Sequence, residues 1–151
     1  HVFNEVIFGK SCFITGPGGT GKTVLLKKCF KTLLTSGKQV SVTASTSIAA
    51  LSVGGQSLHS EIGIGIPKVC TDFKKKGRVS NLQKIITLDV LFIDEISMIS
   101  GELLDLIDEL FRYIRKNPYP FGGLQVVFFG DFLQLSPVSD VNARVKSKKG
   151  F

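Results

Sequence analysis

The feature that most constrains this chain is a glycine-rich run between a short apolar stretch and an amphipathic one. Residues 16–23 read Gly-Pro-Gly-Gly-Thr-Gly-Lys-Thr, which satisfies the spacing of a phosphate-binding P-loop. Glycines let backbone N–H groups converge on a phosphate without Cβ clashes, and the helix that follows directs the positive end of its dipole to the same point. The run therefore predicts a site for a nucleoside triphosphate.

Each residue type in this run has an expected role. The Lys22 ammonium can bridge the β- and γ-phosphates, and the Thr23 hydroxyl can ligate Mg²⁺. A glycine-rich turn could match the pattern by chance, but a strand and a helix are expected on either side of this one. We expect ATP with Mg²⁺ as the ligand, bound by Gly16, Gly18, Gly19, Thr20, Gly21, Lys22 and Thr23.

Apolar periodicity along the chain alternates between strand and helix patterns. Residues 56–80 are rich in glycine and lysine with little period, and are expected to be a loop. The first helix is expected to bury one face that carries Val24, Leu25, Cys29, Phe30, Leu33 and Leu34. Ser100 is expected to cap a helix with an apolar stripe of Leu103, Leu104, Ile107, Leu110, Phe111 and Ile114. Strands are expected at 11–15, 39–44, 90–94 and 125–130, and helices at 22–36, 45–53 and from Ser100 to just before Pro118. This alternation predicts an α/β fold with a parallel sheet flanked by helices.

Two acids end the most apolar of these strands, which reads Val-Leu-Phe-Ile-Asp-Glu over residues 90–95. Asp94 is expected to hold the Mg²⁺ shell at the carboxyl end of a strand beside the P-loop strand. Glu95 is expected to orient and deprotonate the attacking water. Solvated acids at a strand end are the alternative, but after a full P-loop the pair favours nucleotide hydrolysis.

A third polar segment, 130–138, follows the last expected strand. The amide of Gln134 can donate to a γ-phosphate oxygen and lose that bond on hydrolysis, so it could report the nucleotide state. An ordinary exit from strand to loop explains the same residues on chemistry alone.

Several ordered segments resemble the motifs of the PIF family of superfamily 1B DNA helicases. Two departures are Ser47, where motif Ia usually has glycine, and Ser136, where motif III usually has proline. They put fine positioning in doubt rather than the family. The resemblance runs from about Ser11 to Val138 and rests on the segments 43–50 (motif Ia), 55–65, 94–98, 120–125 and 130–138 (motif III).

The resemblance implies an ATP-hydrolysing motor that moves 5′ to 3′ on single-stranded DNA. Such enzymes act in DNA replication, repair, recombination and telomere maintenance. It also implies that residues 1–138 form a RecA-like ATP-binding domain (1A), and that the basic residues 139–151 lead into a second RecA-like domain of the same longer chain. The residues implied to lie on the single-strand path are Thr46, Ser57, Leu58 and His59.

Some of these assignments keep an alternative. His59 could simply hold its own loop in place. Phe121 and Phe132 are expected to anchor the core or a loop rather than to stack on bases. The lysine runs 74–76 and 146–149 are more typical of solvated loops than of binding sites.

Composition adds weaker constraints. A net charge of +7 suits a polyanionic partner such as nucleic acid. Three separated cysteines have neither disulfide nor zinc spacing, so reduced thiols and an intracellular location are expected: the nucleus or a mitochondrion in a eukaryote, the cytoplasm otherwise. No apolar run is long enough for a membrane span, and no membrane partner is expected.

Three alternative functions and one limit on activity follow. A RecD-like helicase domain is the nearest alternative, a P-loop nucleoside kinase is a rival enzyme, and a single-strand-binding module that uses ATP as a switch is a non-enzymatic one. None of Arg78, Arg112, Arg115 and Arg144 lies in a motif that closes on a γ-phosphate. We therefore expect the chain alone to bind nucleotide weakly and to hydrolyse it poorly.

Overall fold

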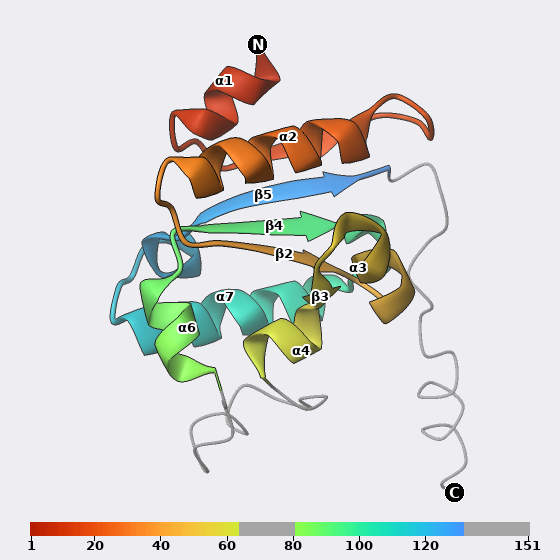
Figure 1. Cartoon of the computed structure of the whole chain (residues 1–151). Helices are drawn as coiled ribbons and strands as arrows, with labels where there is room; N and C mark the ends of the chain where they lie inside the picture. The colour runs from red at the N-terminus through yellow and green to blue at the C-terminus, as the bar shows by residue number, and fades with distance from the viewer. Residues whose placement is uncertain (64–80, 132–151) are drawn as a thin grey trace, which may run out of the picture.

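The computed structural model describes residues 1–63 and 81–131. Their helices and strands alternate along most of the chain, as expected (Figure 1). In chain order they are α1 (Val2–Ile7), β1 (Cys12–Thr15), α2 (Lys22–Thr35), β2 (Val40–Ala44), α3 (Ser47–Val53), β3 (Gln56–Ser57), α4 (Leu58–Ile62), α6 (Leu82–Thr87), β4 (Val90–Asp94), the 3₁₀ turn η1 (Ile96–Met98), α7 (Gly101–Arg115), the 3₁₀ turn η2 (Pro120–Gly123) and β5 (Gln125–Gly130).

The strands form one parallel sheet in the order β1-β5-β4-β2-β3. The central strand β4 is buried at every residue, as a continuous apolar run in a two-sided sheet requires. The four strands expected from the sequence are all present, and the α/β fold is confirmed. Because all strands point the same way, the residues that follow them meet at one edge, the carboxyl edge of the sheet.

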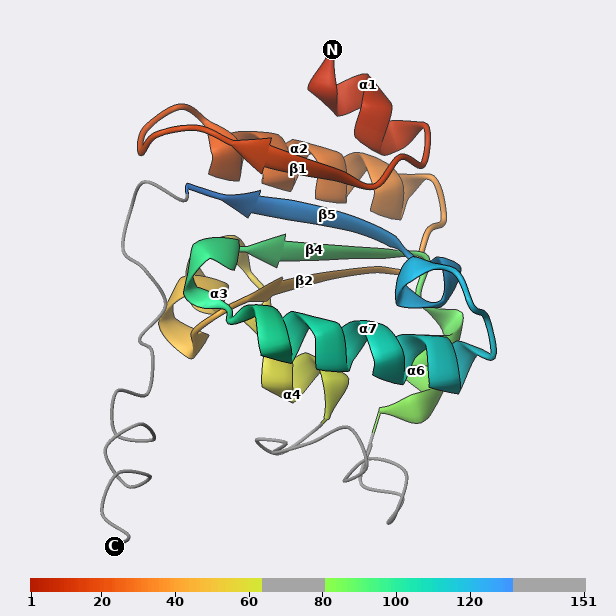
Figure 2. The same cartoon turned by 180° about the vertical axis from the view of Figure 1, so that it is seen from behind.

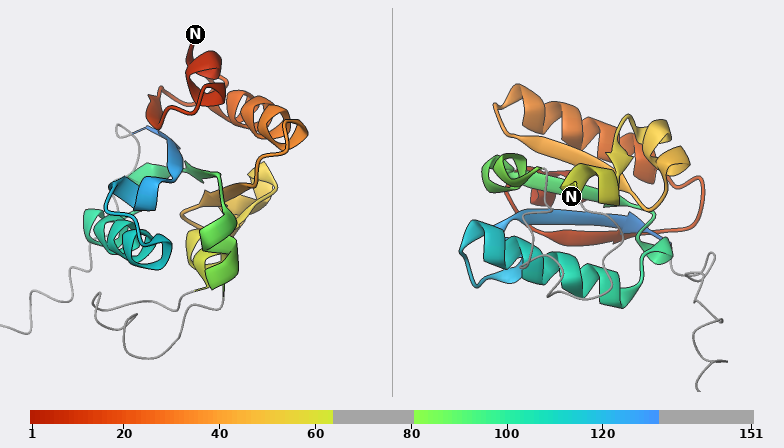
Figure 3. Two further views of the ribbon diagram at one scale, coloured as in Figure 1. Left: turned by 90° about the vertical axis from the view of Figure 1, so that its left-hand side faces the viewer. Right: turned by 90° about the horizontal axis from the view of Figure 1, so that it is seen from below.

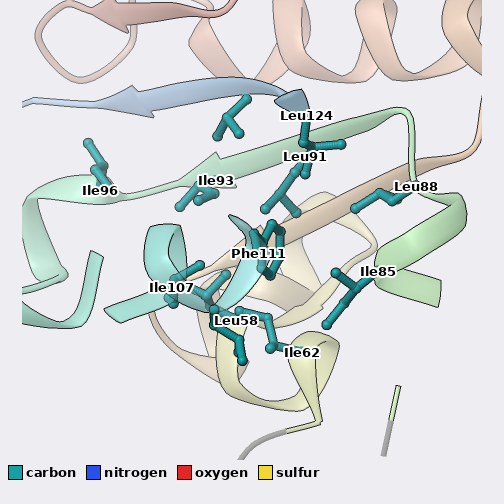
Figure 4. Packing of buried hydrophobic residues seen from close by; sticks show 12 residues of the cluster. Leu58, Ile62, Ile85, Leu88, Leu91, Ile93, Ile96, Ile107, Phe111 and Leu124 are labelled. Carbon is teal, nitrogen blue, oxygen red and sulfur yellow. The ribbon is translucent and has the colours of Figure 1, made fainter. Parts of the chain in front are cut away.

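Helices cover both faces of the sheet (Figures 1 and 2). Helices α1 and α2 lie on one face, and α4, α6 and α7 on the other, which the end-on view also shows (Figure 3). Each face has its own apolar core. Val90, Phe92, Val127 and Phe129 pack toward α2, whereas Leu91, Ile93 and Val126 pack toward α7 with Phe111, Ile107 and Leu58 (Figure 4).

Helix α7 matches its prediction closely. The Ser100 hydroxyl caps it by accepting from the N–H of Leu103 at 3.2 Å. Ile107, Leu110 and Phe111 are buried, and the other three predicted stripe residues pack against them.

The apolar face predicted for α2 is wrong in part. Its buried stripe is Leu26, Cys29 and Leu33, spaced at three and four residues. Val24 is 72% exposed and Leu34 is 45% exposed. Val24 instead lies at the mouth of the P-loop, so its contact is with the cleft described below and not with the core.

Three short helices were not expected. Helices α1 and α6 have six residues each, and α4 has five inside a segment predicted to be loop. The rest of that loop, with the 74–76 lysine run and Cys70, lies outside the described residues, as do Phe132, Gln134 and the 139–151 tail. Cys12 and Cys29 are free thiols. Among the described helices, none has the length and apolar character needed to cross a membrane.

Candidate nucleotide site

The P-loop connects β1 to α2 with a backbone that requires glycine. Gly19 and Gly21 have φ angles of 78° and 85°, a region that side chains disfavour, and Gly21 is the residue that caps α2. A Cβ on Gly16 would lie 2.9 Å from the Thr20 hydroxyl, which itself donates to the carbonyl of Pro17 at 2.8 Å. The loop is therefore closed by its own hydrogen bonds, with no room for a side chain at Gly16 and with backbone angles that favour glycine at Gly19 and Gly21.

Lys22, the first residue of α2, turns its ammonium back over the loop. The Nζ atom donates to the carbonyls of Gly16 and Pro17, the latter at 2.9 Å. This places a positive charge at the centre of the P-loop backbone, where a phosphate is expected. The same charge reaches the carboxyl group of Asp94 and stabilises its ionised form.

Asp94 lies at the end of β4 and is 8% exposed. Burial raises the pKa of its carboxyl group, while the hydrogen bond from the Glu95 N–H at 2.9 Å and the charge of Lys22 act in the opposite direction. Lys22 at the start of α2 and Asp94 at the end of β4 thus lie near enough for the lysine charge to act on the carboxyl group. Both were expected at the nucleotide site.

Glu95 follows in a left-handed conformation, with φ 54° and ψ 44°. Such a conformation is uncommon for a residue with a Cβ, and here it turns the chain sharply from β4 into η1. The two adjacent carboxyl groups consequently have different surroundings, because Asp94 is buried while Glu95 lines the open cleft.

A cleft of about 370 Å³ lies over the P-loop at the carboxyl edge of the sheet. Two acidic residues face the P-loop across it, Glu95 and Asp131. Its lining is Gly18, Gly19, Thr20, Gly21, Lys22, Thr23, Val24, Glu95 and Asp131. Six of the seven predicted nucleotide-binding residues therefore share one cleft with the predicted water-activating acid, and Gly16 lies at the base of the same loop.

Asp131 was not singled out from the sequence. It is 6% exposed and directly follows β5, the strand between β1 and β4. The sequence placed Asp94 on a strand next to the P-loop strand, which is wrong, because β5 lies between β1 and β4. The acid that does follow a strand next to the P-loop strand is Asp131, so the same rule would have found it. Gly130 before it has no room for a Cβ, which would lie 2.8 Å from a methyl group of Ile96.

The residues expected on the DNA path lie at the ends of β2 and β3. The hydroxyls of Thr46 and Ser57 cap α3 and α4, accepting from the N–H groups of Ala49 at 3.1 Å and Ser60 at 3.3 Å. Because Ala44 pairs with Ser57, both helices begin at the carboxyl edge that also holds the nucleotide cleft. Leu58 as a whole residue is 1% exposed and packs in the apolar core, so the structure does not place it on a surface open to DNA.

Two predictions about other side chains can be compared with the structure. Phe121 packs edge-on against Phe111 and Phe128, at 6.4 and 6.0 Å between ring centroids, which confirms that it is a core anchor. Arg115 donates to backbone carbonyls of Ile85, Leu88 and Gly122. It is therefore a structural residue, away from the cleft.

Comparison with known proteins shows the family of this chain. The family model described as PIF1-like helicase matches residues 1–149. The chain belongs to the PIF1-like helicase family. It is 46% identical over 136 residues to the ATP-dependent DNA helicase PIF1 of Saccharomyces cerevisiae, which covers 87% of this chain and 16% of that protein.

Solved structures of the family have the same fold. The crystal structure of Pif1 helicase from Candida albicans superposes with a TM-score of 0.84 at 41% identity, over 93% of this chain and 33% of that one. The crystal structure of Pif1 helicase from Bacteroides in complex with ADP-AlF3 and single-stranded DNA superposes with a TM-score of 0.79 at 33% identity. The match covers 100% of this chain and 37% of that one. The fold is therefore that of Pif1 RecA-like domains, and the chain spans about a sixth to a quarter of the length of its curated relatives.

Proposed function

We propose that this chain is the nucleotide-binding RecA-like domain of an ATP-dependent DNA helicase that moves 5′ to 3′ on single-stranded DNA. The observation that carries the proposal is the cleft at the carboxyl edge of the sheet, where a complete P-loop faces Glu95 and Asp131 in a member of the PIF1-like helicase family. The relatives named above are DNA helicases, and one of them was solved with single-stranded DNA.

Nucleotide binding follows from the P-loop. Backbone N–H groups of residues 18–23 cradle the β-phosphate, and the ammonium of Lys22 moves from loop carbonyls to the β- and γ-phosphates. A phosphate offers that ammonium a full negative charge in place of carbonyl dipoles, so the exchange is favourable.

The residues present fit a magnesium ion. A hydroxyl at Thr23 and a carboxylate at Asp94 are the oxygen ligands that this cation prefers. Among the described contacts of Asp94, hydrogen bonding engages Oδ1 alone, so Oδ2 is available to the coordination shell. When bound, the cation would neutralise charge on the phosphates.

Hydrolysis is assigned to Glu95. Its carboxylate lines the cleft opposite the P-loop, in reach of a water molecule that attacks the γ-phosphate, and it takes the proton from that water. We further propose that Gln134 reports the loss of the γ-phosphate, and that Thr46, Ser57 and His59 hold the phosphates of the single strand.

The remaining parts of the proposal concern the whole protein. Since the chain spans 16% of its yeast relative, we propose that a second RecA-like domain of the same longer protein closes the cleft and supplies an arginine. A motor on DNA works inside the cell, in a nucleus, a mitochondrion or a bacterial cytoplasm. Family membership favours a helicase over the nucleoside-kinase alternative, which an assay of nucleoside phosphorylation would test directly.

The substitution Glu95→Gln in the full-length protein tests the motor. It keeps the size of the side chain but removes the base, so ATP turnover should fall by roughly 10²- to 10³-fold while ATP affinity is kept. Unwinding of a duplex with a 5′ single-stranded tail should be lost with it. The matched control is Glu102→Gln, an exposed acid in the first turn of α7, which should leave both rates unchanged. Unwinding that survives the loss of ATP hydrolysis would refute the proposal.

A further inference from the structure

A buried carboxylate lies outside the nucleotide cleft and has no role in the chemistry above. Glu61 of α4 is 6% exposed. Its Oε1 atom accepts a hydrogen bond from the hydroxyl of Ser41 on β2 and forms an ion pair with Lys84 of α6 at 2.6 Å. A buried charge is costly unless it is paired and hydrogen-bonded. The three side chains therefore form one unit that joins α4 to a strand on one side and to a helix on the other.

Helix α4 depends on such contacts because five residues are too few for a stable helix in isolation. Leu58 and Ile62 fix it to the apolar core, each 1% exposed. The side chain of Asn81 donates to the carbonyl of Glu61 at 2.9 Å and to that of Ser60 at 3.3 Å. The apolar contacts fix how deeply the helix lies, whereas the polar contacts of Glu61 fix where it sits along β2.

The position of α4 matters because of the residues at its start. Ser57 caps the helix and His59 lies in its first turn, and both are proposed to bind DNA. The strand to which Glu61 ties the helix, β2, pairs on its other side with β4. Ser41 is opposite Leu91 and Ala44 is opposite Asp94, so the strand that Glu61 contacts is the direct neighbour of the strand that ends in Asp94.

We propose that Glu61 is a positioning residue for single-stranded DNA, which holds the Ser57–His59 turn in register with the carboxyl edge through Ser41 and Lys84. The inference rests on the proposed DNA site and adds a residue that does not touch DNA. Electrostatics alone argues against an acid here, since a negative charge repels a polyanion. We therefore assign Glu61 a structural role, which is to hold α4 at a fixed position relative to β2 and α6.

The test uses Glu61→Gln and Ser41→Ala in the 151-residue chain and in the full-length protein. Binding is measured by fluorescence anisotropy with a labelled oligothymidylate of about 12 nucleotides, and nucleotide binding with a fluorescent ADP. We expect each variant to bind DNA about fivefold more weakly, with unchanged nucleotide affinity and an unchanged dependence on salt, because no phosphate contact is lost. The double variant should be no weaker than the worse single one, because both disrupt one unit.

A control for charge is Glu5→Gln, which removes a half-exposed acid paired with Lys10 at 2.5 Å near the far edge of the sheet. Both glutamate substitutions raise the net charge from +7 by one, so a purely electrostatic effect would tighten DNA binding equally in both. Only the positioning role predicts that Glu61→Gln binds DNA more weakly while Glu5→Gln binds DNA as tightly as the unaltered protein or more tightly. Ser41→Ala changes no charge, and it carries the test if Glu61→Gln does not fold.

The possible outcomes distinguish failure of this inference from failure of the proposed helicase function on which it rests. If the unaltered full-length protein binds no single-stranded DNA, the proposed function fails and the inference falls with it. If it binds DNA and the Glu61 and Ser41 variants bind equally well, the inference alone is overturned. If DNA and nucleotide affinity fall together, Glu61 supports the fold in general, and the positioning role is also overturned.

Discussion

Asp94 and Glu95 are neighbours in sequence with different environments, and the backbone makes the difference. The last residue of β4 is held in the sheet and buried, and the left-handed turn at the next residue carries the second carboxylate into the cleft. The change from the metal ligand to the proton acceptor that we propose for these two carboxylates would thus take one residue. The sequence shows two acids, but only the backbone geometry shows why they need not act alike.

A first prediction at this scale concerns Asp94→Asn. Burial raises the pKa of Asp94, so the folded state holds its proton more tightly than the unfolded state does. Stability contributed by this group is therefore lost as pH rises from the ordinary aspartate value through the raised one. At neutral pH the ionised group costs stability, and asparagine, which can still accept from the N–H of Glu95, should raise the melting temperature of the chain without ligand.

The same substitution should weaken binding of the magnesium–nucleotide complex by at least about tenfold, because a neutral amide is a poor ligand for this cation. Thermal unfolding across the acidic range and titration with nucleotide measure the two effects. Asp105→Asn, on an exposed face of α7, is the control and should change neither. A lower melting temperature for Asp94→Asn would contradict the argument from burial.

At the scale of single residues, sequence reasoning located most of the cleft because a P-loop is a contiguous run. It missed the place of Asp131 in the cleft, although this acid lies in the 130–138 segment at the end of an expected strand, and it missed the burial of Leu58, which depends on how α4 packs. Glu61 could not have been found either, because its partners are 20 and 23 positions away on β2 and α6 (61 − 41 and 84 − 61).

Among the elements, four of the strands and the helices of seven residues or more were predictable, and the helices of five or six residues were not. Strands β2, β4 and β5 and helix α7 carry unbroken apolar patterns that identify them. Helices α1, α4 and α6 have five or six residues, fewer than two turns, so no period can be read from them. Contacts with the rest of the fold stabilise these short helices, and α6 is an example.

Arg115 supports α6, and the effect of removing this side chain can be predicted at the scale of the element. Its guanidinium donates to carbonyls at the end of α6, to Ile85 at 2.7 Å and Leu88 at 3.0 Å, and to Gly122 at 2.9 Å. Arg115→Met keeps the aliphatic stem but leaves these carbonyls without their donor. We expect a loss of about 2 kcal/mol in the free energy of unfolding.

The comparison for this variant is Arg112→Met in the same turn. Arg112 pairs with Asp108 at 2.7 Å one turn earlier and is 41% exposed, so its loss should cost under about 1 kcal/mol. Denaturant unfolding of both variants measures the difference. Equal losses would show that the arginine does not cap α6.

At the scale of the whole molecule, the cleft and the described arginines lie apart. Arg115 contacts the residues that lead into β4, at the amino edge of the sheet, and Arg112 is engaged on the surface of α7. In the described part of the chain, no arginine lines the cleft over the P-loop. The charge that would stabilise a γ-phosphate in the transition state must come from elsewhere.

We therefore expect the 151-residue chain to bind nucleotide weakly and to hydrolyse ATP about 10³-fold more slowly than the full-length protein, since a closing arginine contributes at least that much in related enzymes. Phosphate release with and without single-stranded DNA measures it. Binding should still be detectable as a rise in melting temperature with added nucleotide. Robust DNA-stimulated turnover by the chain alone would show that it needs no second domain.

The pairing of β1 with β5 has a consequence for how the protein is made. Cys12 lies opposite Val127, and Thr15 opposite Gly130, so within the described sheet the strand that leads into the P-loop finds its partner only at the last strand. During synthesis on the ribosome, the first strand to emerge must wait for almost all of the domain to follow. Until then β1 lacks its neighbouring strand, a state that favours chaperone binding. The P-loop is therefore synthesised well before the strand that completes its part of the sheet. A nascent chain stopped before residue 125 should be unable to bind ATP.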